Sequence, residues 1–315
     1  MSGTMLLRCR REERGVTILR LLSSASSVVL PEELWGLPVT SIAGHAFAPG
    51  CDTGDGELVV FGPPAETDNR RIISVTLPRS VRSVGDYAFY NCTALRSLTL
   101  SGNTERWGGC ALMNCTELRS LHIHLYGESS SAMAYFADEL PWELDMTLSY
   151  PDGQTARLIF PGYRESYEEN SPAHHFDYFI HGAGYPYHHC FEDKHFSFFR
   201  FDSLWQPFLQ MDHEPDCALR LACCRLRHPK ELSEEAGAEY LRYLRAHSGE
   251  AIRWLIDQRD TDGLCWALPL LQPDRDALLS ASALARKRGA TEALALLLEE
   301  HHRRFNAGSE ATFDL

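Results

Sequence analysis

One segment of the sequence gathers the residue types that bind metal ions. Imidazole, thiolate and carboxylate groups are the usual protein ligands of zinc and related transition metals. Among those within residues 174–195 are His174, His175, His181, His188, His189, Cys190, Asp193 and His195. Their spacing matches neither a His-Glu-x-x-His helix nor a pair of Cys-x-x-Cys knuckles. We therefore keep a metal-binding protein or metal-dependent enzyme as the alternative interpretation, with His181, His188, Cys190 and His195 as its ligands.

The surrounding region, from Tyr163 to Trp205, is dense in aromatic side chains. Aromatic rings can stack on bases or sugars, but a site for single-stranded nucleic acid also needs a positively charged groove. Lys194 and Arg200, which lie close to acidic residues, are too few to form such a groove. We therefore expect an aromatic junction between the two halves of the chain, with partly buried histidines.

No nucleophile motif accompanies these residues. The sequence contains no Gly-x-Ser-x-Gly, no Walker loop and no set of protein-kinase motifs. Cys223 and Cys224 have apolar neighbours at helical spacing, so we expect them in a helix core rather than at an active site. The prediction is a protein that is not an enzyme and has no cofactor.

The overall composition limits the classes of partner that the protein could bind. The chain has 315 residues, a formal net charge of −13 and a pI near 5.5. Nucleic-acid binding needs clustered Lys and Arg, and an acidic surface is weakly repelled by anionic membranes, so neither partner is expected. No apolar run is long enough to span a bilayer or to form the core of a signal peptide. We therefore expect a cytoplasmic protein with its ten cysteines reduced and mostly buried, or a secreted or surface protein if an export signal is missing from this sequence.

An internal repeat defines the elements that must position any site. The octapeptide Ala88–Leu95 recurs as Ala111–Leu118, a shift of 23 residues. Its flanks recur at the same spacing, as Ser74–Leu77, Ser97–Leu100 and Ser120–Ile123. A period in the low twenties with one short alternating strand per repeat is typical of a leucine-rich solenoid with a parallel sheet.

The alternation within each repeat assigns side chains to the two faces of that sheet. A fourth strand, Ser27–Leu30, aligns with the other three. The apolar positions of the four strands, such as Val75 and Leu98, should point inward, which leaves Val29, Thr76, Thr99 and His122 as an outer ladder. The binding candidates on this outer face are Ser74, Thr76, Ser97, Thr99, Ser120 and His122. The plainer interpretation is that Ser and Thr simply suit a solvated strand.

The N-terminal part should cover one end of the solenoid. Residues 6–20 are predicted to form a hairpin. This hairpin would cover the terminal repeat, because an open strand edge at the end of a solenoid must be protected. Residues 39–47 align with residues 81–89 at a shift of 42, so an insertion separates the first two repeats. This insertion, residues 49–69, is rich in Gly, Pro, Asp and Thr and is expected to be a loop.

These motifs resemble a known family. The run Gly36–Ile42 with Ala46-Phe47, and the run Ser83-Val84-Gly85-Asp86-Tyr87-Ala88-Phe89-Tyr90-Asn91-Cys92, are similar to the BspA-type leucine-rich repeat over residues 16–125. The resemblance implies that the Ala-Phe pair packs under a short helical turn and that the Asn-Cys pair directs the chain to the next strand. It also implies a bacterial protein that binds other proteins, because the members are mostly surface or secreted adhesion proteins.

The remainder of the chain changes character. Residues 146–160 form a predicted hairpin around Pro151-Asp152-Gly153, which would extend or cap the repeat sheet. Predicted helices then cover residues 215–227, 233–247, 250–258, 261–268, 274–287 and 291–303. The last pair, joined at Gly289, is similar to the helix-turn-helix of an ankyrin repeat.

The sequence therefore predicts an α+β protein with three parts. Residues 1–125 form a short leucine-rich-repeat solenoid with an N-terminal capping hairpin, residues 126–212 a hairpin and an aromatic- and histidine-rich junction, and residues 213–315 an ankyrin-like domain of helical hairpins. The predicted function is a binding or scaffold protein that uses its repeat surfaces to hold a protein or peptide partner.

Overall fold

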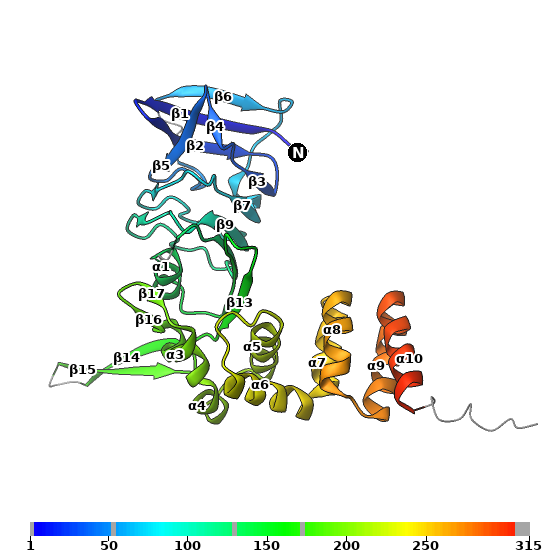
Figure 1. Ribbon diagram of the computed structural model, residues 1–315. Coiled ribbons are helices and arrows are strands. Elements are labelled where there is room, and N and C mark those ends of the chain that lie inside the picture. Colours follow the sequence, from blue (N-terminus) through cyan, green and yellow to red (C-terminus); the bar gives the residue numbers. More distant parts are fainter. Residues whose placement is uncertain (1–2, 52–54, 128–130, 171–173, 306–315) are drawn as a thin grey trace, which may run out of the picture. The chain divides into compact units, whose positions relative to one another are not determined.

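The computed structural model describes residues 3–51, 55–127, 131–170 and 174–305 (Figure 1). The chain divides into two compact units, Met1–Asp212 and His213–Leu315. The first unit holds the strands β1 to β17, and the second holds the helices α5 to α10. The predicted α+β class is therefore confirmed. The hairpin and the aromatic region, which we expected to follow the repeats, belong to the same unit as the repeats.

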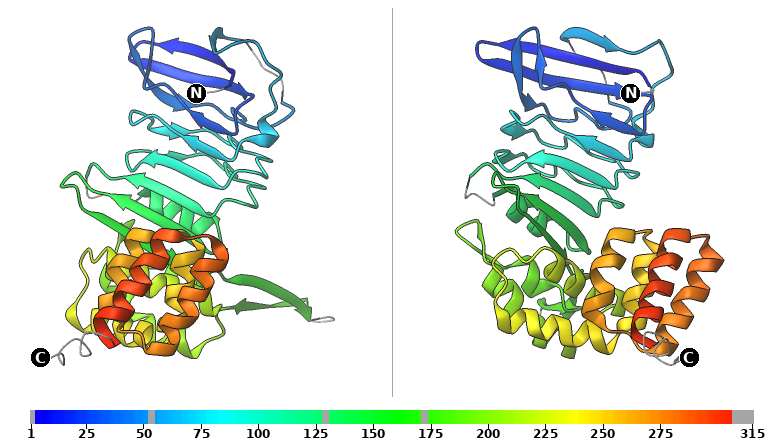
Figure 2. Two further views of the ribbon diagram at one scale, coloured as in Figure 1. Left: turned by 90° about the vertical axis from the view of Figure 1, so that its right-hand side faces the viewer. Right: turned by 45° about the vertical axis from the view of Figure 1, so that its right-hand side comes forward.

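One parallel sheet carries the repeats, as predicted. Its strands, in spatial order, are β3 (Ser27–Val29), β7 (Ser74–Thr76), β9 (Ser97–Ser101), β11 (Ser120–His124) and β12 (Leu144–Ser149), followed by the antiparallel β13 (Thr155–Phe160). The serines that begin the first four strands are paired in register from Ser27 to Ser120. Figure 2 shows these strands stacked in chain order. The predicted hairpin at residues 146–160 does extend the sheet, because β12 pairs in parallel with β11.

A second sheet forms the other side of the solenoid. Its strands, in spatial order, are β10 (Arg106–Trp107), β8 (Ser83–Val84), β5 (Leu37–Ile42), β2 (Gly15–Ser23), β1 (Met5–Glu12) and β6 (Glu57–Phe61), and β4 (Glu33–Leu34) pairs with β5. The predicted N-terminal hairpin is β1 and β2, and it continues the sheet beside β5. The prediction of a loop over residues 49–69 is wrong in part, because β6 pairs with β1 and Asn69–Arg71 form a 3₁₀ helix. Without β6, β1 would be an open edge strand of this sheet, and the insertion covers that edge by pairing β6 with β1. Residues 52–54 lie outside the described part of the chain.

The inward positions of the repeats form the core between the two sheets. At most 4% of the surface of each is exposed, as for Val28, Leu30, Val75, Leu77, Leu98, Leu100, Leu121 and Ile123. The Ala-Phe pairs of successive repeats pack on one another, because the rings of Phe47 and Phe89 are stacked with centroids 4.4 Å apart. The Cys115 thiol donates to the Phe89 carbonyl at 3.2 Å. Each repeat therefore rests on the one before it.

Successive repeats approach so closely that some positions must be glycine. A Cβ atom added to Gly108 would lie 2.3 Å from the backbone nitrogen of Asp86, and one added to Gly85 would lie 2.5 Å from that of Gly44. Heavy atoms cannot approach to these distances without displacing one of the repeats. The Asp86 carboxylate uses this proximity and accepts a 2.8 Å hydrogen bond from the Gly109 N–H.

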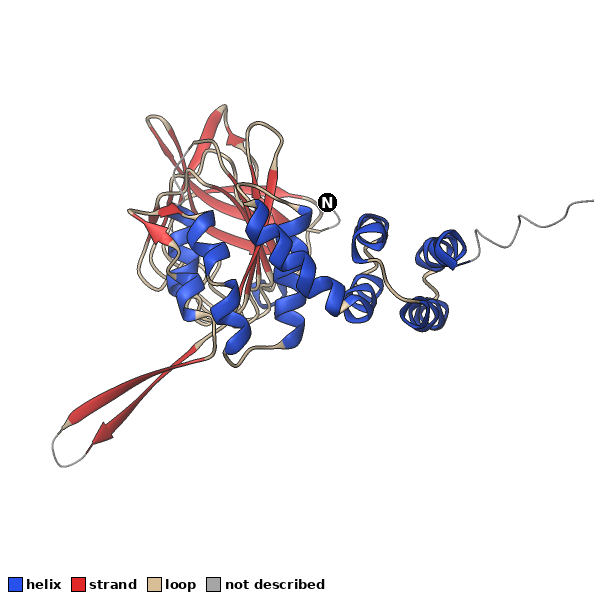
Figure 3. Ribbon diagram, turned by 60° about the horizontal axis from the view of Figure 1, so that its bottom comes forward, coloured by secondary structure: helices blue, strands red, loops and turns tan. Residues whose placement is uncertain are grey.

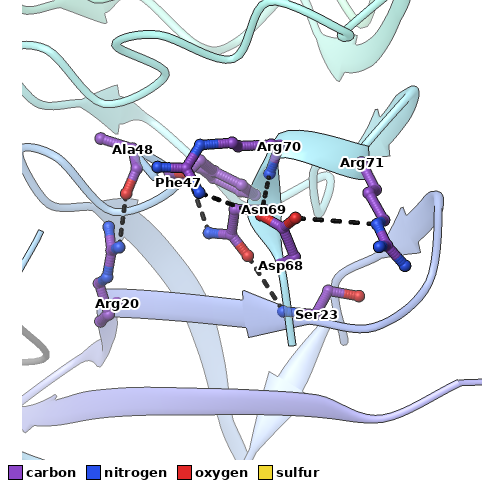
Figure 4. A network of polar contacts seen from close by, with 8 residues as sticks. All are labelled: Arg20, Ser23, Phe47, Ala48, Asp68, Asn69, Arg70 and Arg71. Atoms are coloured by element: carbon purple, nitrogen blue, oxygen red, sulfur yellow. Dashed lines mark hydrogen bonds and ion pairs between the residues drawn. The ribbon is translucent and has the colours of Figure 1, made fainter. Parts of the chain in front are cut away.

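Polar side chains join the N-terminal cap to the first repeat (Figure 4). The side chain of Asn69 donates to the carbonyl oxygens of Leu21 and Phe47 at 2.8 and 2.9 Å, and accepts from the Ser23 N–H at 3.1 Å. Asn69 is 3% exposed. Buried Arg20 donates to the carbonyl of Ala48. These contacts satisfy backbone groups of an irregular turn that would otherwise be buried without partners.

The rest of the first unit surrounds the end of the repeat sheet with short elements. These are α1 (Ser131–Glu139), α2 (Tyr185–His188), the antiparallel pairs β14 (Arg164–Asn170) with β15 (His175–His181) and β16 (Phe191–Glu192) with β17 (His195–Phe196), α3 (Phe198–Ser203) and α4 (Trp205–Gln210). Phe201 packs edge to face against Phe160 of β13 and Tyr187 of α2, with centroids 5.4 and 4.7 Å apart. All three rings are fully buried. Much of the aromatic content is thus core.

In the described residues of the second unit, all regular elements are helices, and loops connect them (Figure 3). Its helices are α5 (Pro215–Arg227), α6 (Glu234–Ala246), α7 (Ser248–Asp257), α8 (Thr261–Leu271), α9 (Arg275–Arg288) and α10 (Thr291–Phe305). Three of them, α6, α8 and α9, begin after a side-chain N-cap, since Ser233, Asp260 and Asp274 each accept a backbone N–H. The resemblance of α9 and α10 to an ankyrin repeat stays a prediction. Within the described residues, no helix has the length and apolar character needed to cross a bilayer.

Candidate functional site

The outer side of the repeat sheet brings all six predicted binding residues together. The strand pairing aligns Ser74, Ser97 and Ser120 in one row, and Thr76, Thr99 and His122 in a second row. The rows continue on β12, since Asp145 lies beside Ser120 and Thr147 beside His122. We call this surface the ladder face. It comprises Ser27, Val29, Ser74, Thr76, Ser97, Thr99, Ser120, His122, His124, Asp145, Thr147, Ser149 and Arg157.

The middle of the ladder face is flat because its side chains are short. The hydroxyl of Ser74 donates to that of Ser27 at 2.8 Å, so neighbouring strands share hydrogen bonds between side chains. Val29 is 45% exposed, whereas Thr76 and Thr99 are half-buried by their neighbours along the rows. Hydroxyl groups both donate and accept, so this surface can hydrogen-bond polar atoms of a partner.

One end of the ladder face is charged and aromatic. Arg157 makes two hydrogen bonds to the Asp145 carboxylate, at 2.9 and 2.6 Å. Next to this pair, His122 Nε2 lies 2.8 Å from the Ser149 hydroxyl, and the rings of His122 and His124 are 4.4 Å apart. Burial, and then repulsion from His124, lower the pKa of His122. His122 is therefore neutral at neutral pH and can both donate and accept a hydrogen bond.

Sequence reasoning missed the part of the ladder face on β12 and β13. Asp145, Thr147 and Ser149 alternate with buried Leu144, Met146 and Leu148, which is the same pattern as in the repeats. The signal was present, but β12 follows β11 at 25 residues rather than 23 and lacks the preceding Ala-Phe and Asn-Cys pairs. Its register on β11 comes from the tertiary structure.

The structure does not assemble the alternative metal site. His181 lies on β15 with Nε2 2.8 Å from the Ser166 hydroxyl, and exposed His195 lies on β17. His188 is buried, with its two ring nitrogens 2.7 and 2.9 Å from the carbonyl oxygens of Ala137 and Pro161, so neither nitrogen is free for a metal. Burial raises the pKa of the Cys190 thiol to about 12, which disfavours the thiolate that binds metals. In the described ranges, no three His, Cys, Asp or Glu residues are placed to hold an ion.

Two histidines of the 174–195 segment, His188 and His189, instead line a pocket of about 430 Å³. Its lining also includes Trp107 and Tyr135, whose rings are stacked with centroids 4.8 Å apart. The pocket is lined by both acidic and basic side chains, including Glu105, Asp138 and Lys194.

Comparison with known proteins identifies the repeats. Residues 67–137 match the model of the BspA type leucine rich repeat region (6 copies). This part of the chain is similar to BspA-type leucine-rich repeats. The BspA-type match covers the sheet from β7 to β11 and ends within α1. It confirms the resemblance drawn from the Ala-Phe and Asn-Cys motifs.

Two solved structures of leucine-rich proteins are similar to the chain. One is a leucine-rich repeat protein of T. pallidum, with 25% identity over 40% of this chain and 54% of that protein, and a TM-score of 0.30. The other is a leucine-rich cell surface protein of Faecalibacterium prausnitzii, with 19% identity over 48% of this chain and 42% of that protein, and a TM-score of 0.26. The chain thus spans about half the length of these structures. Among curated proteins, none matches the chain.

Proposed function

We propose that this protein is a non-catalytic binding or scaffold protein that holds a protein or peptide partner on the ladder face. The observation that carries the proposal is the in-register alignment of Ser and Thr from four strands, continued by Asp145 and Thr147 on β12. Solenoids commonly bind partners along such a continuous repeat surface. The BspA-type match supports a role in protein interaction.

The composition of the ladder face indicates how a partner would be recognised. Its rows offer hydroxyl donors and acceptors at the strand spacing of roughly 4.8 Å, which suits a partner with regularly spaced polar groups. The ion pair of Asp145 and Arg157 and the neutral His122 distinguish one end of the rows from the other. Large aromatic anchors dominate tight interfaces, and this face is made mostly of short side chains. We therefore expect moderate affinity and a partner fixed in one direction.

The expected class of partner and the expected location of the protein are inferred from its composition. The net charge of −13 argues against nucleic-acid and membrane partners. Seven of the ten cysteines are buried. Cytoplasmic placement stays a prediction, with the secreted or surface location as the alternative.

The test compares two double variants that carry the same substitutions. T76E/T99K places an opposite-charge pair on the ladder face, and T93E/T116K places the same pair on exposed repeat turns. Cross-linking and mass spectrometry of native extracts should recover a reproducible partner with the wild type and with T93E/T116K, but not with T76E/T99K. Equal recovery by both variants would show that the partner binds elsewhere.

A further inference from the structure

The strand β6 forms an open edge of the second sheet. It pairs with β1 on one side, and no strand of the described residues pairs with its other side. In the strand order it lies at the end opposite to β10, which is the N-terminal end of the solenoid (Figure 1). An open edge presents unpaired backbone N–H and C=O groups, so it can accept a strand from another chain.

The sequence of β6 does not protect this edge. Soluble proteins usually blunt an open edge with Lys, with Pro or with a β-bulge. The five residues Glu-Leu-Val-Val-Phe include neither Lys nor Pro, and their pairing with β1 has no shift in register. Gly62, with a φ of +83°, and Pro63 then follow the strand. The open edge is therefore short, apolar and regular.

The two faces of β6 differ in their exposure. Leu58 and Val60 are 51% and 53% exposed, and they lie on the same face of the sheet as Leu6 of β1. The intervening Val59 and Phe61 are half-buried on the face that covers the core. Exposed apolar side chains next to an open strand edge favour association with a further strand.

A second copy of β6 complements this edge residue by residue. If two antiparallel strands continue one sheet with their core faces on the same side, each residue must pair with one an even number of positions away. The register centred on Val59 meets this condition and uses all five residues. It places Leu58 of one copy opposite Val60 of the other, and Glu57 opposite Phe61, so apolar side chains meet along the strand.

The charges at this edge also agree with a second copy. Glu57 is the one charged residue of β6, and its carboxylate lies 2.9 Å from Arg11 of the same chain. The register centred on Val59 keeps the two copies of Glu57 at opposite ends of the contact, so like charges do not face each other. A foreign strand would find no unpaired charge on β6 to select it, whereas a second copy matches β6 in length and in apolar pattern.

We propose that the protein forms a two-fold dimer in which β6 pairs antiparallel with β6 of a second copy, so that the two second sheets become one continuous sheet. The same surface is used by both copies, as in most two-fold dimers. A contact of five residues from each chain is small, so we expect a dissociation constant on the order of 10 µM. The ladder face belongs to the other sheet, so the dimer does not depend on the proposed function.

The test is sedimentation velocity of the full chain between about 1 and 200 µM. The wild type should change from monomer to dimer over this range. L58K/V60K places lysines opposite each other in the paired strands and should weaken the association at least about tenfold. The control L279K/L298K makes the same change in charge at two leucines of the second unit, each 51% exposed, and should associate like the wild type. Circular dichroism of each variant verifies its fold.

A mixing experiment tests the register. In the pairing centred on Val59, L58K of one copy lies opposite V60E of the other, whereas L58K and L58E lie diagonally. The first mixture should therefore associate about threefold more tightly than the second, because directly opposite charges interact more strongly than diagonal ones. Equal association of the two mixtures would overturn the register.

Hydrogen exchange locates the contact. In the wild type, protection of residues 57–61 should increase with protein concentration, and T76E/T99K should behave identically because the ladder face is not involved. A monomer at every concentration, unchanged association of L58K/V60K, or an equal loss in L279K/L298K would overturn the proposal. Protection of residues 57–61 that requires another protein, with the pure chain monomeric, would assign the edge to a foreign strand instead.

Discussion

The side-chain nitrogen of Asn114 donates a hydrogen bond of 2.8 Å to the side-chain oxygen of Asn91, across the boundary between two repeats. Both residues have left-handed backbone angles, with φ of +64° and +59°. Asn tolerates this conformation better than most residues, and its amide can both donate and accept. The Asn of the Asn-Cys pair therefore has two roles, one in the turn and one between repeats.

The first prediction concerns this asparagine pair. N91A should lower the free energy of unfolding by about 1–2 kcal/mol. The variant loses the hydrogen bond to Asn114, and alanine tolerates the left-handed backbone conformation less well than asparagine does. N91G should cost less, because glycine adopts this turn freely. Urea unfolding of both variants provides the comparison. A larger loss for N91G than for N91A would contradict the argument.

The second prediction concerns the close approach of repeats at Gly108. G108A should destabilise the first unit by about 1–3 kcal/mol, because the added methyl group meets the backbone of Asp86. The neighbouring G109A is the matched control, since its Cβ would have no atom nearer than 4.0 Å. Thermal unfolding should show a lower Tm for G108A and little change for G109A. Similar values for the two would mean that the repeats can move apart at little cost.

The third prediction concerns the cap. N69A should cost about 2–4 kcal/mol, because it leaves the backbone groups of Leu21, Ser23 and Phe47 buried without their side-chain partner. Half-exposed Asn103, replaced by Ala in the same way, should change the stability by less than about 0.5 kcal/mol. Denaturant unfolding followed by circular dichroism measures both. A stable N69A variant would show that water can replace the amide.

The fourth prediction concerns pH. Burial lowers the pKa values of His122 and His188 in the folded protein, although hydrogen bonds to the carbonyls of Ala137 and Pro161 oppose the effect at His188. The unfolded chain, with the ordinary histidine pKa of about 6.5, then binds protons more readily than the folded chain. Stability contributed by the neutral rings is complete above about pH 6.5 and falls as the pH decreases below it.

The measurement is the urea midpoint between pH 7.5 and 5.5. H122Q keeps a hydrogen-bonding group near Ser149 but cannot titrate, so its midpoint should depend less on pH than that of the wild type. H188Q should reduce the dependence further, because His188 is the more deeply buried of the two. An unchanged slope in both variants would assign the pH dependence to other groups.

The fifth prediction concerns the thiols. Burial raises the pKa of Cys115 and Cys190 to about 12 and that of Cys9 to about 11, whereas Cys110 and Cys265 are exposed. Iodoacetamide reacts with the thiolate, so the three buried thiols should react at least about a hundredfold more slowly than the two exposed ones. Peptide mapping before and after denaturation measures this ratio. Rapid labelling of Cys115 in the native protein would show that the repeats open readily.

Local patterns were sufficient to determine the repeat fold. The 23-residue shift between the Asn-Cys pairs and the alternation of Val75, Leu77, Leu98 and Leu100 fix both the strands and the faces that they bury, because a strand has a period of two and an apolar face must be covered. The helices of the second unit followed equally from local signals. Ser233 and Asp274 mark helix starts through hydrogen bonds that span three residues.

The site depended on contacts that local patterns do not encode. The histidines between His174 and His195 form one cluster in the sequence, but they are divided among an extended arm, a buried helix end and a small hairpin, because β14 and β15 pair with each other rather than folding back. The insertion gained the strand β6 only by pairing with β1, which lies about fifty residues earlier in the chain. The ladder face likewise acquired Asp145 and Arg157 when β12 and β13 joined the sheet. The sequence by itself thus determined which residues are buried within each repeat, since burial follows the local period, whereas tertiary pairing decided which polar residues share a surface.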